Sequence, residues 1–280
     1  MVKSLFSARL VSFLMAGFAL SHGAALAQTE DLSQREHEVV VAWTEYVAQE
    51  EGTPLTEIDI PAFDGRIPQE AIARKARSAS LLNRRRVPVN ATLPVIETVA
   101  QSRRLTSRAV AERALALMIV TIKADTRDDA FVTEVMEAYG AEAYLSPLER
   151  EYVFTTAATE NDHLQNVWRY EALYTLLWAL GFTDELGHPD EVSNVEWTAQ
   201  TLLELGPDGF FAQARLRNQS VLLDQADLIY RYHWAAREAA DANSVMPAGV
   251  DRSVVIERHY TLNWLIGYLD QDWDEISTDT

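Results

Sequence analysis

Strong charges recur on apolar helical segments in the last third of this chain, and no other feature constrains the fold as much. Ionised side chains are costly to bury unless they are paired and hydrogen-bonded. The segments that carry them are otherwise rich in Leu, Ile, Tyr and Trp, which is too apolar for surface helices. We therefore expect an internal polar network. Its charged members are Glu171, Asp224, Asp227, Arg231, Glu257 and Arg258.

Helix start signals recur along the chain, whereas the alternation typical of strands is almost absent. Capping residues followed by a glutamate predict helix starts near residues 33, 146 and 193. One alternating triplet, residues 58–60, could form a short strand. The sequence thus predicts an all-α protein with a single compact multi-helix domain at 68–280, an N-terminal helical arm and at most one short strand pair. The expected helices cover residues 33–50, 68–83, 106–123, 128–139, a segment from 147, 161–178, 193–206, 220–243 and 251–268.

The first 27 residues have the three-part pattern of a secretory signal peptide. Lys3 and Arg9 form a positive region, residues 10–20 an apolar stretch, and residues 25–27 (Ala-Leu-Ala) a cleavage site. The apolar stretch has about 11 residues, fewer than the roughly 20 that span a bilayer. We expect cleavage after Ala27, no stable membrane anchor afterwards, and an exported bacterial protein, periplasmic or secreted. Residues 28–67 then hold the helical arm and an irregular, proline-containing connection.

The acidic composition limits the possible partners. The chain has 42 Asp and Glu residues against 24 Lys and Arg, and such a balance repels nucleic acid and anionic membranes. We expect no nucleic-acid partner, which leaves a protein or a small molecule. The chain has no cysteine, so disulfides and thiolate chemistry are excluded. Lysine occurs only at 3, 75 and 123, so arginine, which suits multidentate pairing with carboxylates, carries nearly all positive charge.

Two stretches of the chain carry a family resemblance. The first joins residues 73–78 (Ala-Arg-Lys-Ala-Arg-Ser), 87–90 (Val-Pro-Val-Asn), 93–96 (Leu-Pro-Val-Ile) and 111–117 (Ala-Glu-Arg-Ala-Leu-Ala-Leu). The second joins residues 168–173 (Trp-Arg-Tyr-Glu-Ala-Leu), 177–181, 223–231 (Leu-Asp-Gln-Ala-Asp-Leu-Ile-Tyr-Arg), 233–235, 257–260 (Glu-Arg-His-Tyr), 262–264 and the tail to 280. Over residues 73–280 the chain resembles the bacterial family catalogued as domain of unknown function 4272. The resemblance implies a helical fold and no particular reaction, and the export signal departs from the mostly cytosolic location that it implies.

Helical projection places the charges of the 220–243 segment on one side, with apolar residues covering the others. That charged side should be internal or line a cleft. Asp227 and Arg231 are four residues apart, a spacing that favours a pair within one helix. If the charges only lock helices together, the protein is a non-catalytic binding or interaction module, which is our first hypothesis. The expected network comprises Asp224, Asp227, Arg231, Trp234, Glu257, Arg258 and Trp264.

An enzymatic alternative uses two carboxylates in unequal surroundings. Glu171, Asp227 and Glu257 all lie near tryptophans or apolar residues. One carboxyl group would have a raised pKa and act as an acid, and the other would stay ionised. Such a pair would suit a glycosidase-like hydrolase of the envelope. A cleft that opens these carboxylates to water would favour the enzyme, and a closed, fully paired cluster would favour the binding module.

A second alternative is metal binding through histidine. His233 could join Asp227 or Glu257 if the fold brings them together, whereas His259 lies on an apolar stripe typical of a core residue. No histidines have the four-residue spacing of a helical metal site, so we expect no metal and no cofactor. The tail should pack back on the domain, because Trp273 and Ile276 are apolar anchors.

Overall fold

The structure, a computed structural model, describes residues 68–280. All regular secondary structure in this part of the chain is helical, and it contains no strand, so the all-α prediction is confirmed. The expected signal peptide, the helix at 33–50 and the triplet at 58–60 lie outside the described residues. No helix between residues 68 and 280 has the length and apolarity to cross a membrane.

The helices follow one another with short connections, apart from two longer irregular segments at residues 85–106 and 180–194. The elements are α3 Gln69–Arg84, α4 Ser107–Thr126, α5 Asp129–Tyr139, η2 Ala141–Tyr144, α6 Pro147–Phe154, α7 Glu160–Val167, α8 Arg169–Ala179, α9 Val195–Gln213, α10 Gln219–Asp241, η3 Pro247–Gly249, α11 Arg252–Ile266, η4 Tyr268–Asp270 and η5 Trp273–Glu275.

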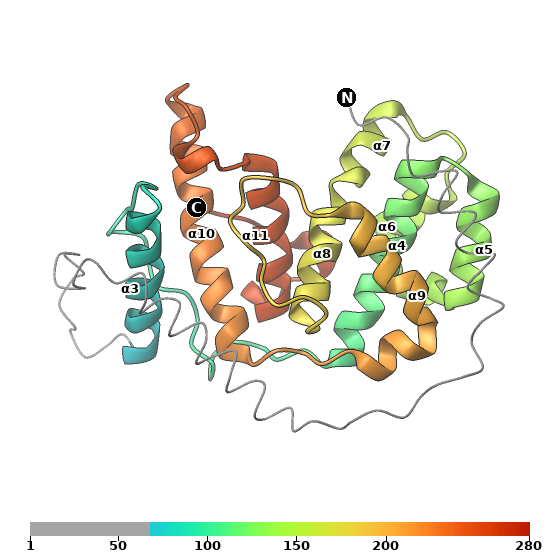
Figure 1. Ribbon diagram of the computed structural model, residues 1–280, viewed down its shortest axis with the longest axis horizontal. Helices are drawn as coiled ribbons and strands as arrows, with labels where there is room; N and C mark the ends of the chain where they lie inside the picture. The colour runs from blue at the N-terminus through green and yellow to red at the C-terminus, as the bar shows by residue number, and fades with distance from the viewer. Residues whose placement is uncertain (1–67) are drawn as a thin grey trace.

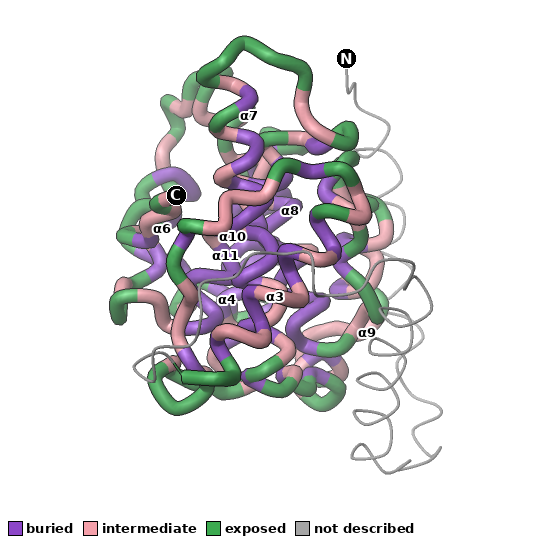
Figure 2. The backbone as a smooth tube through the Cα atoms, turned by 90° about the vertical axis from the view of Figure 1, so that its left-hand side faces the viewer, coloured by how far each residue is buried: buried purple, intermediate pink, exposed green. Residues whose placement is uncertain are grey.

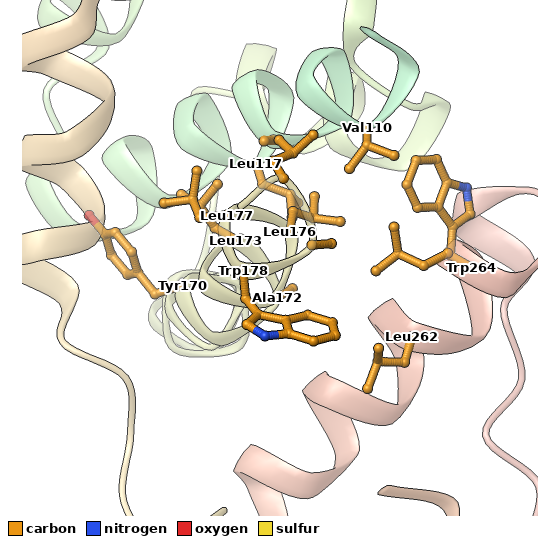
Figure 3. Packing of buried hydrophobic residues seen from close by; sticks show 14 of the residues in the cluster. Val110, Leu117, Tyr170, Ala172, Leu173, Leu176, Leu177, Trp178, Leu262 and Trp264 are labelled. Atoms are coloured by element: carbon orange, nitrogen blue, oxygen red, sulfur yellow. The ribbon is translucent and has the colours of Figure 1, made fainter. Parts of the chain in front are cut away.

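The packing runs in sequence across the molecule from α3 through α10, α11 and α8 to α4 (Figure 1). Helix α3 lies at one edge and packs on α10, whereas α4 also contacts α5, α6, α7 and α9 on the opposite side. Buried residues are concentrated in the inner helices, and many residues of the connections around them are exposed (Figure 2). The close view of the core shows α8 between α4 and α11, with Leu173, Leu176 and Trp178 directed into the apolar cluster (Figure 3).

Most predicted helix starts are confirmed by side-chain caps. Thr106, Asp128 and Asp251 each accept hydrogen bonds from backbone N–H groups of the first turn. Ser146 forms the expected capping box with Glu149. These caps satisfy donors that have no partner within a helix.

One predicted helix is divided in the structure, and one predicted helix stop is followed by a further helical segment. The expected 161–178 helix is divided at Trp168. There the N–H of Glu171 donates to the Trp168 carbonyl at 3.0 Å, which closes a tight turn. The expected stop at residues 206–207 is present, because Gly206 adopts a left-handed φ of 60°. Pro207 then occupies the first turn of a new helical segment that continues to Gln213.

Helix α4 is more central than its sequence pattern indicated. From the sequence we expected the buried helices to lie in the last third of the chain. Instead every residue from 113 to 124 is buried, including Arg113 and Lys123. The Lys123 ammonium donates to the carbonyls of Val153 (2.8 Å) and Thr155 (2.7 Å). These hydrogen bonds supply donors for carbonyl groups at the C-terminal end of α6. Small residues on the remaining faces of α4 let neighbouring helices approach on all sides.

The C-terminal tail packs back on the domain, as predicted. Trp273 and Ile276 are both buried, and the Trp273 ring meets Tyr260 and Trp264 edge-on at centroid distances of 5.1 Å and 5.4 Å. The Asp274 carboxylate accepts hydrogen bonds at the start of α6, from Ser146 Oγ (2.6 Å) and from a backbone N–H. The tail therefore joins α11 to α6.

Replacement of Trp273 by alanine should reduce the free energy of unfolding by about 3 kcal/mol, because it leaves a cavity between three aromatic and cationic side chains. The measurement is chemical denaturation of the mature chain. Val245→Ala is the matched control, since Val245 is 92% exposed and should change stability by less than about 0.5 kcal/mol. Equal effects of the two substitutions would show that the tail is not part of the packed domain.

Candidate functional site

Glu171 and Arg258 form a closed ion pair between α8 and α11. Arg258 Nε donates to Glu171 Oε1 at 2.7 Å, and the side chains are 5% and 1% exposed. The second carboxylate oxygen accepts the backbone N–H of Ser193 at 2.8 Å, and Arg258 Nη1 donates to the Gly187 carbonyl at 3.1 Å. The pair thus also fixes the irregular 180–194 segment. Glu171 has no free oxygen with which to transfer a proton to a substrate.

Glu257 is paired with a different arginine. Arg169 Nη1 lies 3.1 Å from Glu257 Oε2, and the Arg169 guanidinium also stacks 4.7 Å from the centroid of the Tyr260 ring. Burial raises the pKa of the Glu257 carboxyl, Arg169 opposes the shift, and the charge of Glu171 adds to it. The two glutamates are therefore electrostatic neighbours, but each one has its own arginine.

Asp227 and Arg231 form the intrahelical pair that the sequence predicted. Arg231 Nε and Nη2 donate to the two carboxylate oxygens of Asp227 at 2.9 Å and 2.7 Å. Arg231 Nη2 also donates to the Pro94 carbonyl. Nearby, the buried Lys75 ammonium donates to the carbonyls of Ala91 and Leu93. Burial and the Arg231 charge lower the pKa of Lys75, and Asp227 opposes them.

Asp224 faces α3 and takes no part in the Asp227 pair. Its Oδ1 atom accepts from Arg74 Nε at 3.2 Å and from Arg77 Nη2 at 2.6 Å. Burial raises the pKa of the Asp224 carboxyl although both arginines oppose it. A small open pocket beside these groups, lined also by Leu81 and Leu228, has a volume of about 10 Å³, at the lower limit of the space that can hold one water molecule.

The predicted network is therefore a set of separate pairs. The charged residues named from the sequence are all engaged. Four of them pair with one another, Glu171 with Arg258 and Asp227 with Arg231. Asp224 and Glu257 instead pair with arginines that the sequence did not single out, on α3 and α8. Trp264 packs on the tail through Trp273, and Trp234 is a half-buried residue at the edge of the apolar core. The tryptophans contribute apolar packing around the pairs.

The structure brings His233 and His259 together. Their Nδ1 atoms lie 2.8 Å apart between α10 and α11, and the ring planes are perpendicular with centroids 5.1 Å apart. One ring donates its Nδ1–H group to the unprotonated Nδ1 atom of the other, so the acceptor ring must be neutral. Burial lowers the pKa of His233 to about 4 with help from Arg252 and Arg237, and lowers the pKa of His259 to about 3.

The metal hypothesis finds no support in this geometry. Within residues 68–280, no three His, Cys, Asp or Glu side chains are grouped so that they could hold a metal ion. His233 is hydrogen-bonded to His259, whereas Asp227 and Glu257 are each bound to an arginine.

Several paired residues were not identified from the sequence. Arg113 pairs with Glu149 in the interior and stacks 4.9 Å from the centroid of the Trp273 ring. Arg169 and Lys75 were likewise missed. A positive charge amid the apolar stripe of α4 was the available signal for Arg113. No local pattern marks Arg169 or Lys75, whose partners are distant in sequence.

These features define a helical protein with closed Arg–carboxylate pairs between its helices. The chain belongs to the family described as domain of unknown function (DUF4272), whose model matches residues 74–276. No curated protein matches the chain. No solved structure matches it either.

Arg258→Met should reduce the free energy of unfolding by about 3–5 kcal/mol, because it leaves the Glu171 carboxylate buried without its cation. Denaturant titration at neutral pH measures the loss. The matched control is Arg127→Met, which breaks an exposed pair with Glu160 and should cost less than about 1 kcal/mol. The double variant Arg258→Met/Glu171→Leu should recover part of the loss. A small effect of Arg258→Met alone would refute the structural role of the pair.

Acid should destabilise the protein through the histidine pair. The pKa values in the folded protein, about 4 and about 3, lie below the usual 6.5, so the unfolded chain binds more protons. The stability that the pair contributes is complete above pH 6.5 and is lost as the pH falls through 4 to about 3. His259→Gln keeps a hydrogen-bonding partner for His233 and should flatten the dependence by about 1.4 kcal/mol per pH unit. Denaturant titrations between pH 7 and pH 4 measure this slope, and an unchanged slope would contradict the assignment.

Proposed function

We propose that this chain is an exported, non-catalytic binding module of the cell envelope. The observation that carries the proposal is the state of the three candidate catalytic carboxylates. Glu171, Asp227 and Glu257 are each bound to an arginine, and Glu171 and Asp227 are closed to water. Charges arranged in this way fix the positions of helices and do not transfer protons. A rigid helical body of this kind suits recognition through its surface.

The charge distribution supports a positively charged partner. Residues 110–280 contain 30 Asp and Glu against 11 Lys and Arg, and Arg113, Arg169, Arg231 and Arg258 among the 11 are engaged in internal pairs. The remaining carboxylates give the surface an excess of negative charge. Such a surface attracts basic proteins or cationic small molecules and steers their association.

Export is supported by the pattern of residues 1–27. A positive start, a short apolar stretch and the Ala-Leu-Ala site are the features that the secretion machinery recognises. The absence of cysteine is compatible with an oxidising compartment. On this proposal the mature chain begins at Gln28 and works in the periplasm or outside the cell.

A second candidate function is a hydrolase that depends on Glu257. Its side chain is 15% exposed, burial raises its pKa, and a second carboxylate, Glu171, is near. A carboxyl group whose pKa is raised by burial can stay protonated and act as a general acid. The Arg169 pair argues against this function, because the carboxyl must leave the arginine before it can act.

The two functions can be separated with one variant. Thermal unfolding of the mature chain is measured with and without fractions of the bacterial envelope, since a ligand that binds the folded state raises Tm. We expect at least one fraction to raise Tm equally for the wild type and for Glu257→Gln, with its components chemically unchanged. Mass spectrometry of the fraction provides the second readout. Products that form with the wild type and not with Glu257→Gln would establish the hydrolase instead.

Export makes a separate prediction. The full chain expressed in a bacterium should be recovered from the periplasm or the medium with Gln28 as its first residue, as found by N-terminal sequencing. Leu14→Arg interrupts the apolar stretch and should keep the full-length chain inside the cell. Wild-type protein that stays inside the cell and retains Met1 would disprove export.

A further inference from the structure

The tail occupies a groove that combines an aromatic box with an anion site. The Trp273 ring lies among Tyr260, Trp264 and the Arg113 guanidinium. The next residue, Asp274, places its carboxylate at the N-terminus of α6, where Ser146 Oγ and the Leu148 N–H donate to it at 2.6 Å and 3.0 Å. An arginine over an aromatic ring and a carboxylate at a helix N-terminus are both favourable arrangements. The groove thus fits an aromatic residue followed by an acidic one.

Further contacts hold the rest of the tail. Asn263 Nδ2 donates to the Ser277 carbonyl at 2.8 Å, and the Ser277 N–H donates to Gln271 Oε1 at 3.0 Å. Ile276 is buried. The groove residues that contact Trp273 and Asp274 belong to α4, α6 and α11, whereas Gln271 belongs to the short connection and would move with the tail. Any copy of the same tail could make the same contacts.

That connection is strained. Leu269 and Asp270 both adopt φ of 53°, a left-handed conformation that is unfavourable for residues with a Cβ atom. Leu269 is also 65% exposed, so little packing offsets the strain. The turn before them is fixed, because Ile266 accepts the Arg103 N–H at 3.1 Å and Gly267 lies against Arg103. Residues 269–272 are therefore the segment in which the chain could open.

We propose that the tail, residues 273–280, exchanges between two copies of this chain, so that each groove holds the Trp273–Asp274 pair of the other copy. The tail contacts are the same in the closed monomer and in the exchanged dimer. Opening of residues 269–272 lets Leu269 and Asp270 return to ordinary φ values, which favours the dimer, whereas the entropy of association opposes it. Short strained connections promote exchange of this kind. The dimer should accordingly increase with protein concentration.

The test is light scattering after size exclusion of the mature chain over a hundredfold range of concentration. We expect a dimer fraction that rises with concentration in the wild type. Leu269→Gly relieves the strain in the closed form and should lower the dimer fraction about fivefold. Ala248→Gly is the matched control, because Ala248 has a φ of 52° in a turn remote in sequence from the tail and should leave the fraction unchanged.

A second variant should increase the dimer fraction. Proline cannot adopt a positive φ, so Asp270→Pro should force residues 269–272 open and shift the protein to the dimer. Trp273 fluorescence, compared with that of Trp273→Ala to isolate its signal, shows whether the tail is docked. A wild type that stays monomeric at every concentration would overturn the proposal. So would an Asp270→Pro monomer with an exposed Trp273, or a dimer whose fraction is the same in Leu269→Gly and in the wild type.

Discussion

Pairing of buried charge between distant segments is the constraint on which this fold depends. Glu171 cannot remain ionised in the core without Arg258, and that pair also holds the backbone of the 180–194 segment. Arg113 and Glu149 serve in the same way between α4 and α6. Because a buried charge that loses its partner is very unfavourable, arrangements of the helices that separate these pairs are disfavoured. Specific packing and charge pairing therefore select the same structure.

The chain is also divided by charge along its length. Residues 68–109 contain nine Arg and Lys against two Glu, whereas the remainder of the described chain is strongly acidic. This basic segment forms α3 and the connection to α4, and it packs along α10. Arg74 and Arg77 of the segment pair with Asp224 of α10, and Arg231 of α10 donates to the Pro94 carbonyl of the segment. The two stretches that carry the family resemblance thus meet in space at this contact. Arginines of the first stretch and a carboxylate of the second thus form the two sides of one interface.

Local features of the sequence were sufficient to predict the helices and one of the ion pairs. Capping residues located the starts of α4, α6 and α11, and the four-residue spacing identified Asp227 with Arg231. The partner of Glu171 is 87 residues away, and nothing in a single sequence determines which arginine reaches it. The burial of residues 113–124 of α4 was missed for a related reason, since small residues look neutral until neighbouring helices are placed against them. The candidate carboxylates were thus found, but their closed state depends on tertiary contacts.

The positions of the lysines have a chemical consequence. Lys75 and Lys123 are the lysines of the described chain, and both ammonium groups are buried and donate to backbone carbonyls. Positive charge on the exterior of residues 68–280 is therefore guanidinium. Primary amines are the groups that react with aldehydes, reducing sugars and activated esters, and guanidinium is far less nucleophilic because it stays protonated. While it is folded, this body is inert to glycation and acylation at lysine, and reagents that label proteins through surface amines find no target on it.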